Sequence, residues 1–81
     1  MLGYFKVITF YQFINLKKVK TLAQELKCFC VSNKIRGSLI LAEEGVNGTL
    51  AGSPNNIDAF EQYIIEKGMA NLNVKYSKIN E

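Results

Sequence analysis

The chain has 81 residues, enough for one small domain that buries only about 60% of the surface its unfolded form exposes. Hydrophobic residues make up 48% of the sequence and charged residues only 21%, a balance that excludes an intrinsically disordered chain. Histidine, the commonest general base and transition-metal ligand, is absent, and the net charge of +3 is a smaller excess than a dedicated nucleic-acid binder of this size usually carries.

The first half of the chain predicts a strand, a helix and a second strand. Tyr4 to Phe13 is rich in aromatic and β-branched side chains, which is typical of a strand covered on both faces. From Lys17 to about Asn33, apolar residues recur at spacings of three and four while lysines occupy another side, so this segment predicts an amphipathic helix. Ser38 to Glu43 is apolar in its middle and predicts the second strand.

A hairpin is predicted after the second strand. Asn-Gly is the strongest short-range turn signal, so we expect the turn within Glu44–Gly48 and a short strand at Thr49–Ala51. Three glycines within eight residues would let another backbone or a ligand approach closely. The adjacent carboxylates of Glu43 and Glu44 would face opposite sides of a strand, so they do not predict a paired acid–base mechanism.

A second helix and a last strand complete the pattern. Ser53 and Pro54 predict the helix start, because a hydroxyl at the N-cap and proline at the first helical position are both favourable. The helix is expected to extend to Lys67 and to end at Gly68. Apolar residues from Val74 to Ile79 alternate with lysine and serine, which indicates a strand with one polar side.

The predicted element order is β-α-β-β-α-β. With right-handed crossovers this order gives an α+β, ferredoxin-like βαββαβ sandwich, a four-stranded antiparallel sheet with two helices on one face. The apolar first strand should be central, and the last strand, which carries lysines, should lie at an edge. We expect a single domain over residues 1–81, and its fold alone does not define a function.

The two cysteines, Cys28 and Cys30, do not predict a metal or redox site. Residues two apart on a helix point to different sides and cannot form a disulfide, and the sequence has no third cysteine or histidine to complete a soft-metal site. We expect both to be core residues, because cysteine is among the most buried residue types. Two free thiols favour a reducing compartment, so we expect a cytoplasmic protein.

Basic residues crowd the first predicted helix and the turn after it. Between Lys17 and Arg36 only one acidic residue, Glu25, opposes them. Such a local excess indicates either a solvated helix face or a patch that follows RNA phosphates. The candidate substrate-binding residues are Lys17, Lys18, Lys20, Lys27, Lys34 and Arg36.

Two other activities known for this fold find little support. Tyr4, Phe10 and Tyr11 could stack on bases, but Gly48–Ala51 lacks the aromatic residues that RNA-recognition sheets carry on their third strand. Acylphosphatases need a glycine-rich, arginine-bearing loop after the first strand, and Ile14–Lys17 contains neither residue type.

The stretch Ala42–Thr49, with the sequence AEEGVNGT, resembles the A-x-E-G-[IVF]-N-G hairpin in the N-terminal domain of the rhodanese-containing tRNA uridine hydroxylases. Other segments agree with this family: the aromatic first strand, Arg36-Gly37 before the second strand, Gly52-Ser53 at the second helix and the closing strand Val74–Ser77. The resemblance covers nearly all of the chain, and the hairpin is its most specific part.

The resemblance implies an activity for the full-length protein. Members of the family hydroxylate the wobble uridine of certain tRNAs to 5-hydroxyuridine, with molecular oxygen as co-substrate. Their essential cysteine belongs to a rhodanese-like domain that follows this one, so we expect tRNA and such a domain, beyond residue 81, as partners. Neither Cys28 nor Cys30 corresponds to that cysteine, so we expect no catalytic residue, cofactor or metal in this chain. The motif positions carried over are Glu44, Gly45, Asn47 and Gly48.

Two alternatives to a substrate-handling domain of a tRNA hydroxylase stay open from the sequence. The domain could be purely structural, docking on the rhodanese-like domain without touching RNA. It could also be a small-ligand regulatory module, which would require self-association, whereas we expect a monomer. The apolar runs are too short to span a membrane, so no membrane partner is expected.

Overall fold

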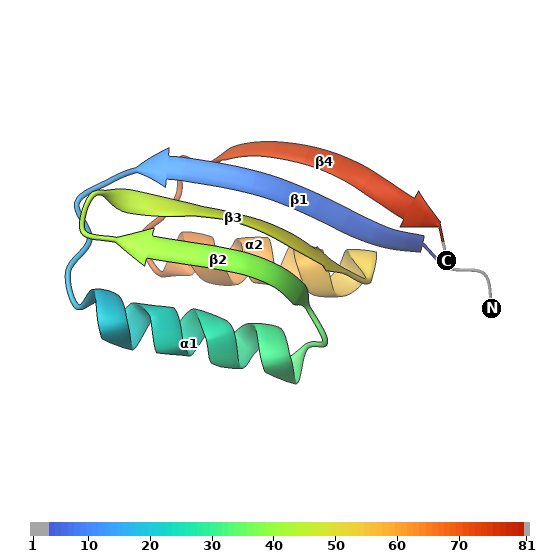
Figure 1. Cartoon of the computed structure of the whole chain (residues 1–81), viewed down its shortest axis with the longest axis horizontal. Helices are drawn as coiled ribbons and strands as arrows, with labels where there is room; N and C mark the ends of the chain where they lie inside the picture. The colour runs from blue at the N-terminus through green and yellow to red at the C-terminus, as the bar shows by residue number, and fades with distance from the viewer. Residues whose placement is uncertain (1–3, 81) are drawn as a thin grey trace.

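The computed structural model describes residues 4–80, and side chains of residues 4–79, as one antiparallel sheet with two helices (Figure 1). The strands lie in the order β2-β3-β1-β4. This arrangement confirms the predicted ferredoxin-like α+β fold. The elements are β1 (Tyr4–Phe13), α1 (Val19–Ser32), β2 (Arg36–Ala42), β3 (Gly45–Gly52), α2 (Pro54–Glu66) and β4 (Asn73–Asn80).

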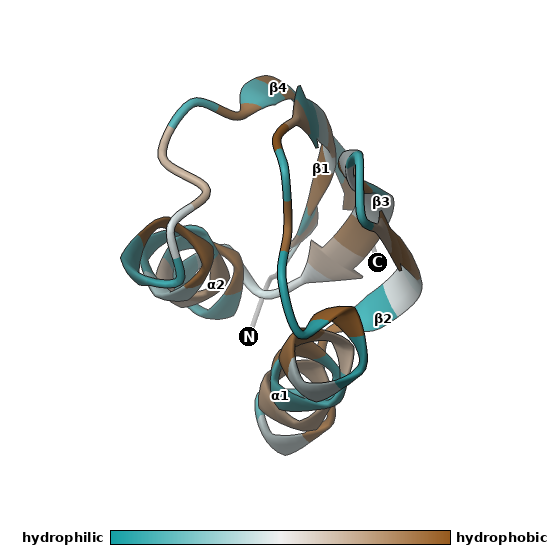
Figure 2. Ribbon diagram, turned by 90° about the vertical axis from the view of Figure 1, so that its left-hand side faces the viewer, coloured by the Kyte–Doolittle hydropathy of each residue, from teal (hydrophilic) through white to brown (hydrophobic). Residues whose placement is uncertain are grey.

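Both helices cover the same face of the sheet, and within residues 4–80 the opposite face carries no helix (Figure 2). This follows from the right-handed β-α-β crossovers, which bring each helix back onto the same side. β1 lies in the centre, paired with β3 on one side and β4 on the other, as predicted. β2 and β4 are the two edges, so the predicted edge position of the last strand is confirmed.

The core lies between the helices and the covered face of the sheet. Ile8 and Phe10 of β1 point into it, and the Phe10 ring lies 5.8 Å from that of Phe60 on α2. Leu26 lies on the buried side of α1 and packs into the same core. Each fully buried side chain of this size stabilises the fold by about 1.5–3 kcal/mol relative to an exposed position. These contacts fix the sheet on which the candidate site is built.

The expectation that Tyr4–Phe13 is covered on both faces is wrong. Residues of β1 alternate between buried and exposed, and the uncovered face presents Phe5, Tyr11 and Phe13. The sequence misleads because aromatic residues occupy both faces of the strand, although helices pack on only one. The domain therefore exposes large apolar side chains on its open sheet face.

The helix ends follow local rules with one exception. At α2 the Ser53 hydroxyl accepts a hydrogen bond from the Asn56 amide at 3.3 Å, and the backbone turns at Gly68 with φ +104°, both as predicted. α1 begins at Val19 instead of Lys17, because Lys18 takes left-handed backbone angles of 54° and 47°. Within residues 4–80, neither helix combines the length and apolar character needed to cross a bilayer.

Candidate nucleic-acid interface

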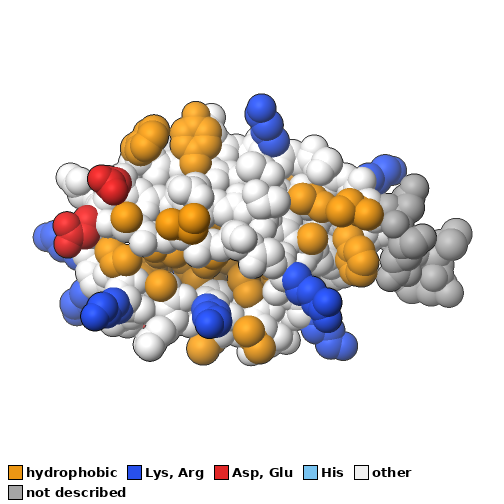
Figure 3. Space-filling view, viewed as in Figure 1, with side chains coloured by type: hydrophobic (Ala, Val, Ile, Leu, Met, Phe, Trp, Pro, Cys, Tyr) orange, Lys and Arg blue, Asp and Glu red, His pale blue; other side chains and the backbone are white. Residues whose placement is uncertain are grey.

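Five of the six predicted cations lie along α1 or next to its two ends, and the sixth, Arg36, begins the neighbouring edge strand β2. Lys20 and Lys27 are two helical turns apart, about 10 Å along the helix axis. Lys17 and Lys18 precede the helix, and Lys34 follows it. Figure 3 shows lysine and arginine side chains spaced along this border of the molecule. We call the full set, Lys17, Lys18, Lys20, Lys27, Lys34 and Arg36, the basic strip; all six residues are exposed.

The positive charge of the basic strip is not neutralised locally. Glu25, the single acid between its two ends, turns toward the other helix, where its carboxylate lies 3.0 Å from the Lys67 ammonium. Among the residues that the structure describes, no member of the strip lies within 4.0 Å of a carboxylate oxygen. The strip is therefore a row of solvated cations, a surface suited to a polyanion.

Two residues near the ends of the basic strip have unusual backbone angles. Lys18 and Lys34 both have positive φ, at 54° and 56°, a conformation that residues other than glycine adopt rarely. Side-chain hydrogen bonds hold the loop after α1: the Asn33 Nδ2 donates to the Phe29 carbonyl at 2.9 Å, and the Asn56 Nδ2 donates to the Asn33 carbonyl at 2.8 Å. The loop that carries Lys34 is thereby fastened to both helices.

An apolar crevice of about 470 Å³ lies between α1 and β2, with cations at its rim. Its lining includes Ile35 and Leu39, while Lys27 and Arg36 border it. Hydrophobic side chains are visible in this crevice above the row of cations in Figure 3. Sequence reasoning missed the crevice, although Val31, an apolar residue 71% exposed on the outer side of α1, is a signal that could have indicated it.

The predicted position of the hairpin turn is wrong. The turn consists of Glu43 and Glu44, and the strands pair directly from Ala42 and Gly45 onward. Asn47 and Gly48 lie within β3 instead of forming the turn. Two backbone hydrogen bonds hold the acidic turn against the chain after β1: Ile14 N–H donates to the Glu44 carbonyl at 3.0 Å, and Leu16 N–H donates to the Glu43 carbonyl at 2.8 Å.

The four motif residues divide into two structural and two accessible positions. At Gly45 a Cβ atom would lie 2.3 Å from the Gln12 carbonyl oxygen, and at Gly48 it would lie 2.9 Å from the Phe10 ring. Both glycines are therefore needed for close packing. Glu44 and Asn47 are exposed. Only these last two offer side chains that a ligand could reach.

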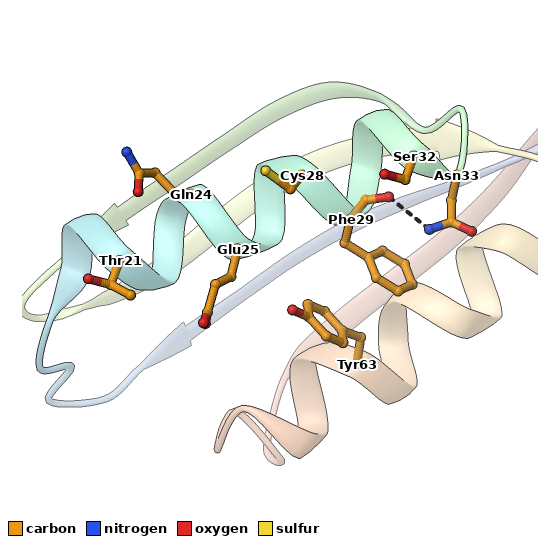
Figure 4. A pocket seen from close by; sticks show the side chains of 8 residues that line it. All are labelled: Thr21, Gln24, Glu25, Cys28, Phe29, Ser32, Asn33 and Tyr63. Carbon is orange, nitrogen blue, oxygen red and sulfur yellow. Dashed lines mark hydrogen bonds between the residues drawn. The ribbon is translucent and has the colours of Figure 1, made fainter.

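A groove between the helices contains the exposed cysteine (Figure 4). The rings of Phe29 and Tyr63 stack there with centroids 4.4 Å apart. Cys28 lies at this groove and is exposed, so its predicted core position is wrong, whereas Cys30 is buried as expected. Burial raises the pKa of the Cys30 thiol to about 11, and both thiols are free. Among residues 4–80, no three cysteine, aspartate or glutamate side chains gather as a metal site.

A four-stranded antiparallel sheet in this order, with two helices on one face, defines an acylphosphatase-like domain of the ferredoxin type. The chain belongs to the UPF0176 family: residues 5–81 match its UPF0176 acylphosphatase-like domain. The likeness to acylphosphatase concerns the fold, since the loop after β1 contains neither glycine nor arginine.

Three curated relatives of this chain carry the same name. A protein of Bradyrhizobium diazoefficiens named tRNA uridine(34) hydroxylase is 42% identical over 89% of this chain, and one of Ehrlichia ruminantium with the same name is 43% identical over 82%. A third, from Teredinibacter turnerae, is 40% identical over 93% of the chain. The matches cover only 30%, 25% and 24% of those proteins, so the chain corresponds to less than a third of their length.

Proposed function

We propose that this chain is the substrate-handling domain of an oxygen-dependent tRNA hydroxylase that forms 5-hydroxyuridine at the wobble position. The names of its relatives carry this proposal. In it, the reaction itself belongs to a rhodanese-like domain that follows residue 81 in the cytoplasmic full-length protein. The role of this chain is to hold the tRNA.

The basic strip supports a direct contact with tRNA phosphates. Its cations are exposed, and Glu25, the one acid between Lys17 and Arg36 in the sequence, is engaged by Lys67 at the end of the other helix. α1 is 14 residues long, or about 21 Å, so the strip can meet several successive phosphates of one RNA backbone. Binding through such contacts releases counterions and therefore weakens as salt concentration rises. A purely structural docking domain would show no such binding.

Binding of tRNA by the 81-residue chain should be weak and should fall steeply with salt. Replacing Lys20 and Lys27 by glutamine should reduce the slope of log affinity against log salt by about two, one for each phosphate contact removed. Fluorescence anisotropy with a labelled tRNA between about 50 and 200 mM salt measures this slope. Lys78→Gln on β4 is the matched control and should leave it unchanged. Binding that does not depend on salt concentration, or no binding at low salt, would contradict the RNA role. The alternative of a purely structural docking domain would then stand.

The coding sequence after residue 81 tests the other half of the proposal. A rhodanese-like domain with a cysteine at the head of its active loop is expected there, because the relatives extend to more than three times the length matched here. A stop codon directly after residue 81 would contradict the assignment. Sequencing the gene region decides between the two results.

A further inference from the structure

A hollow of about 490 Å³ lies on the open face of the sheet, at the end where β1 meets the hairpin turn. Three neighbouring strands each contribute one side chain in register: Tyr11 of β1 pairs with Asn47 of β3, which pairs with Ile40 of β2. Phe13 extends the hollow, and its ring makes an edge contact with that of Tyr11 at a centroid distance of 5.8 Å. We call this site the terminal hollow.

The aromatic rings of the terminal hollow are accessible from solvent. Phe13 is 83% exposed and Tyr11 is 47% exposed, because the helices cover only the other face. In Figure 3, hydrophobic side chains project from the sheet at the end where β1 terminates, beside acidic side chains. Exposed aromatic faces of this kind are stacking platforms for unpaired bases of single-stranded RNA.

The polar groups of the hollow match the edge of a base. Within the described residues, the Asn47 side-chain amide makes no hydrogen bond, so both its donor and its acceptor are free. An amide pairs with the adjacent donor and acceptor on the edge of uracil, donating to a carbonyl oxygen and accepting from N3–H. The exposed carboxylate of Glu44 at the rim repels a phosphate, so an uncharged base is the better ligand for the hollow.

Beyond the acidic turn, the charges on the open face favour RNA over a protein partner. On the open face the described strands carry two cations, Arg36 and Lys75, and no acid. Lys75 pairs with Thr9, two residues before Tyr11 and so roughly 7 Å along the strand, where it can meet the phosphate of a bound nucleotide. The centre of the face is polar, with the Thr9 and Thr49 hydroxyls 3.4 Å apart, unlike the apolar centre of a protein interface.

We propose that the terminal hollow binds one unstacked nucleobase of single-stranded RNA, with the base stacked on the Phe13 ring, beside Tyr11, and its edge on Asn47. This inference rests on the proposed function in one respect, that RNA is the ligand. Lys17 and Lys18 directly follow Ile14–Leu16, the segment that is hydrogen-bonded to the hairpin turn. The basic strip therefore begins at the same end of the domain as the terminal hollow. One RNA strand can therefore follow the strip and place a base in the hollow.

Two short oligomers test the proposal with the 81-residue chain: an oligouridylate, and the same ribose-phosphate chain without bases. The oligouridylate should bind roughly 5- to 150-fold more tightly, the range that one stacked base supplies. Phe13→Ala should remove this preference, whereas Phe5→Ala, which truncates an exposed ring at the other end of the same strand, should keep it. Asn47→Ala should keep the preference for bases but lose discrimination against N3-methylated oligouridylate.

The outcomes separate this proposal from the function on which it rests. Equal, salt-dependent binding of both oligomers would overturn the base site, leave the basic strip intact and assign the open face to a protein partner. A preference lost in Phe5→Ala but kept in Phe13→Ala would overturn the location. If neither oligomer nor tRNA bound at low salt, the RNA function itself would fail, and this inference with it. Circular dichroism of each variant checks that the fold is retained.

Discussion

Replacing Gly45 by alanine should destabilise the 81-residue chain by roughly 3 kcal/mol or more. A Cβ at this position would lie 2.3 Å from the Gln12 carbonyl oxygen, a contact that real side chains do not make. The obstacle is backbone of the central strand, so no side-chain rotation can relieve it. The backbone φ of +157° adds conformational strain for any residue with a side chain.

The loss of stability should come from separation of β1 and β3 next to the hairpin turn. Gly45 pairs with Phe13, and the turn beside it is held by the hydrogen bond from Ile14 N–H to the Glu44 carbonyl. Separating the strands by enough to admit a methyl group would break these contacts. Urea unfolding followed by circular dichroism gives the change in the free energy of unfolding.

Gly68→Ala is the matched control for backbone strain. Gly68 also has positive φ, at +104°, but apart from its own chain neighbours no atom of the described residues lies within 4 Å of the position its Cβ would occupy. The control should therefore cost only about 1 kcal/mol, the strain contribution alone. If both alanine variants lost the same stability, the close approach of Gly45 to Gln12 would be contradicted.

The fold could be predicted from the sequence because each element has a local signal. Apolar spacing in α1, the Ser53-Pro54 start of α2 and the glycine after it all agree with the structure. The hairpin turn could not be placed, since Asn47-Gly48 is a strong local signal that strand pairing overrides. The residue that decides where the turn lies is Gly45, because only a glycine fits this closely against the Gln12 carbonyl of the neighbouring strand.

The candidate site could be predicted only in part. The six cations of the basic strip are visible in the sequence, and the exposure of Lys20 and Lys27 follows from the helical pattern. The sequence could not show that Lys67, 42 positions further along the chain, engages Glu25. The alignment of Tyr11, Asn47 and Ile40 is equally hidden, because it depends on the register of three strands.

The aromatic residues of this domain lie in two different environments, and truncation to alanine should separate their contributions to stability. Phe60 is fully buried and contacts the Phe10 and Phe29 rings at 5.8 and 6.2 Å. Phe60→Ala should cost about 3–5 kcal/mol through lost burial and the cavity left behind. A domain of this length has a total stability of only about 4–12 kcal/mol, so the variant should be marginal or unfolded.

Phe13→Ala deletes the same atoms at an 83% exposed position and should change stability by no more than about 0.5 kcal/mol. Thermal and urea unfolding measured side by side provide the comparison. Equal losses in the two variants would contradict the burial of Phe60 between the sheet and α2. Because Phe60→Ala should leave the domain marginal or unfolded, the proposed RNA binding is tested only by a variant such as Phe13→Ala, whose fold should be retained.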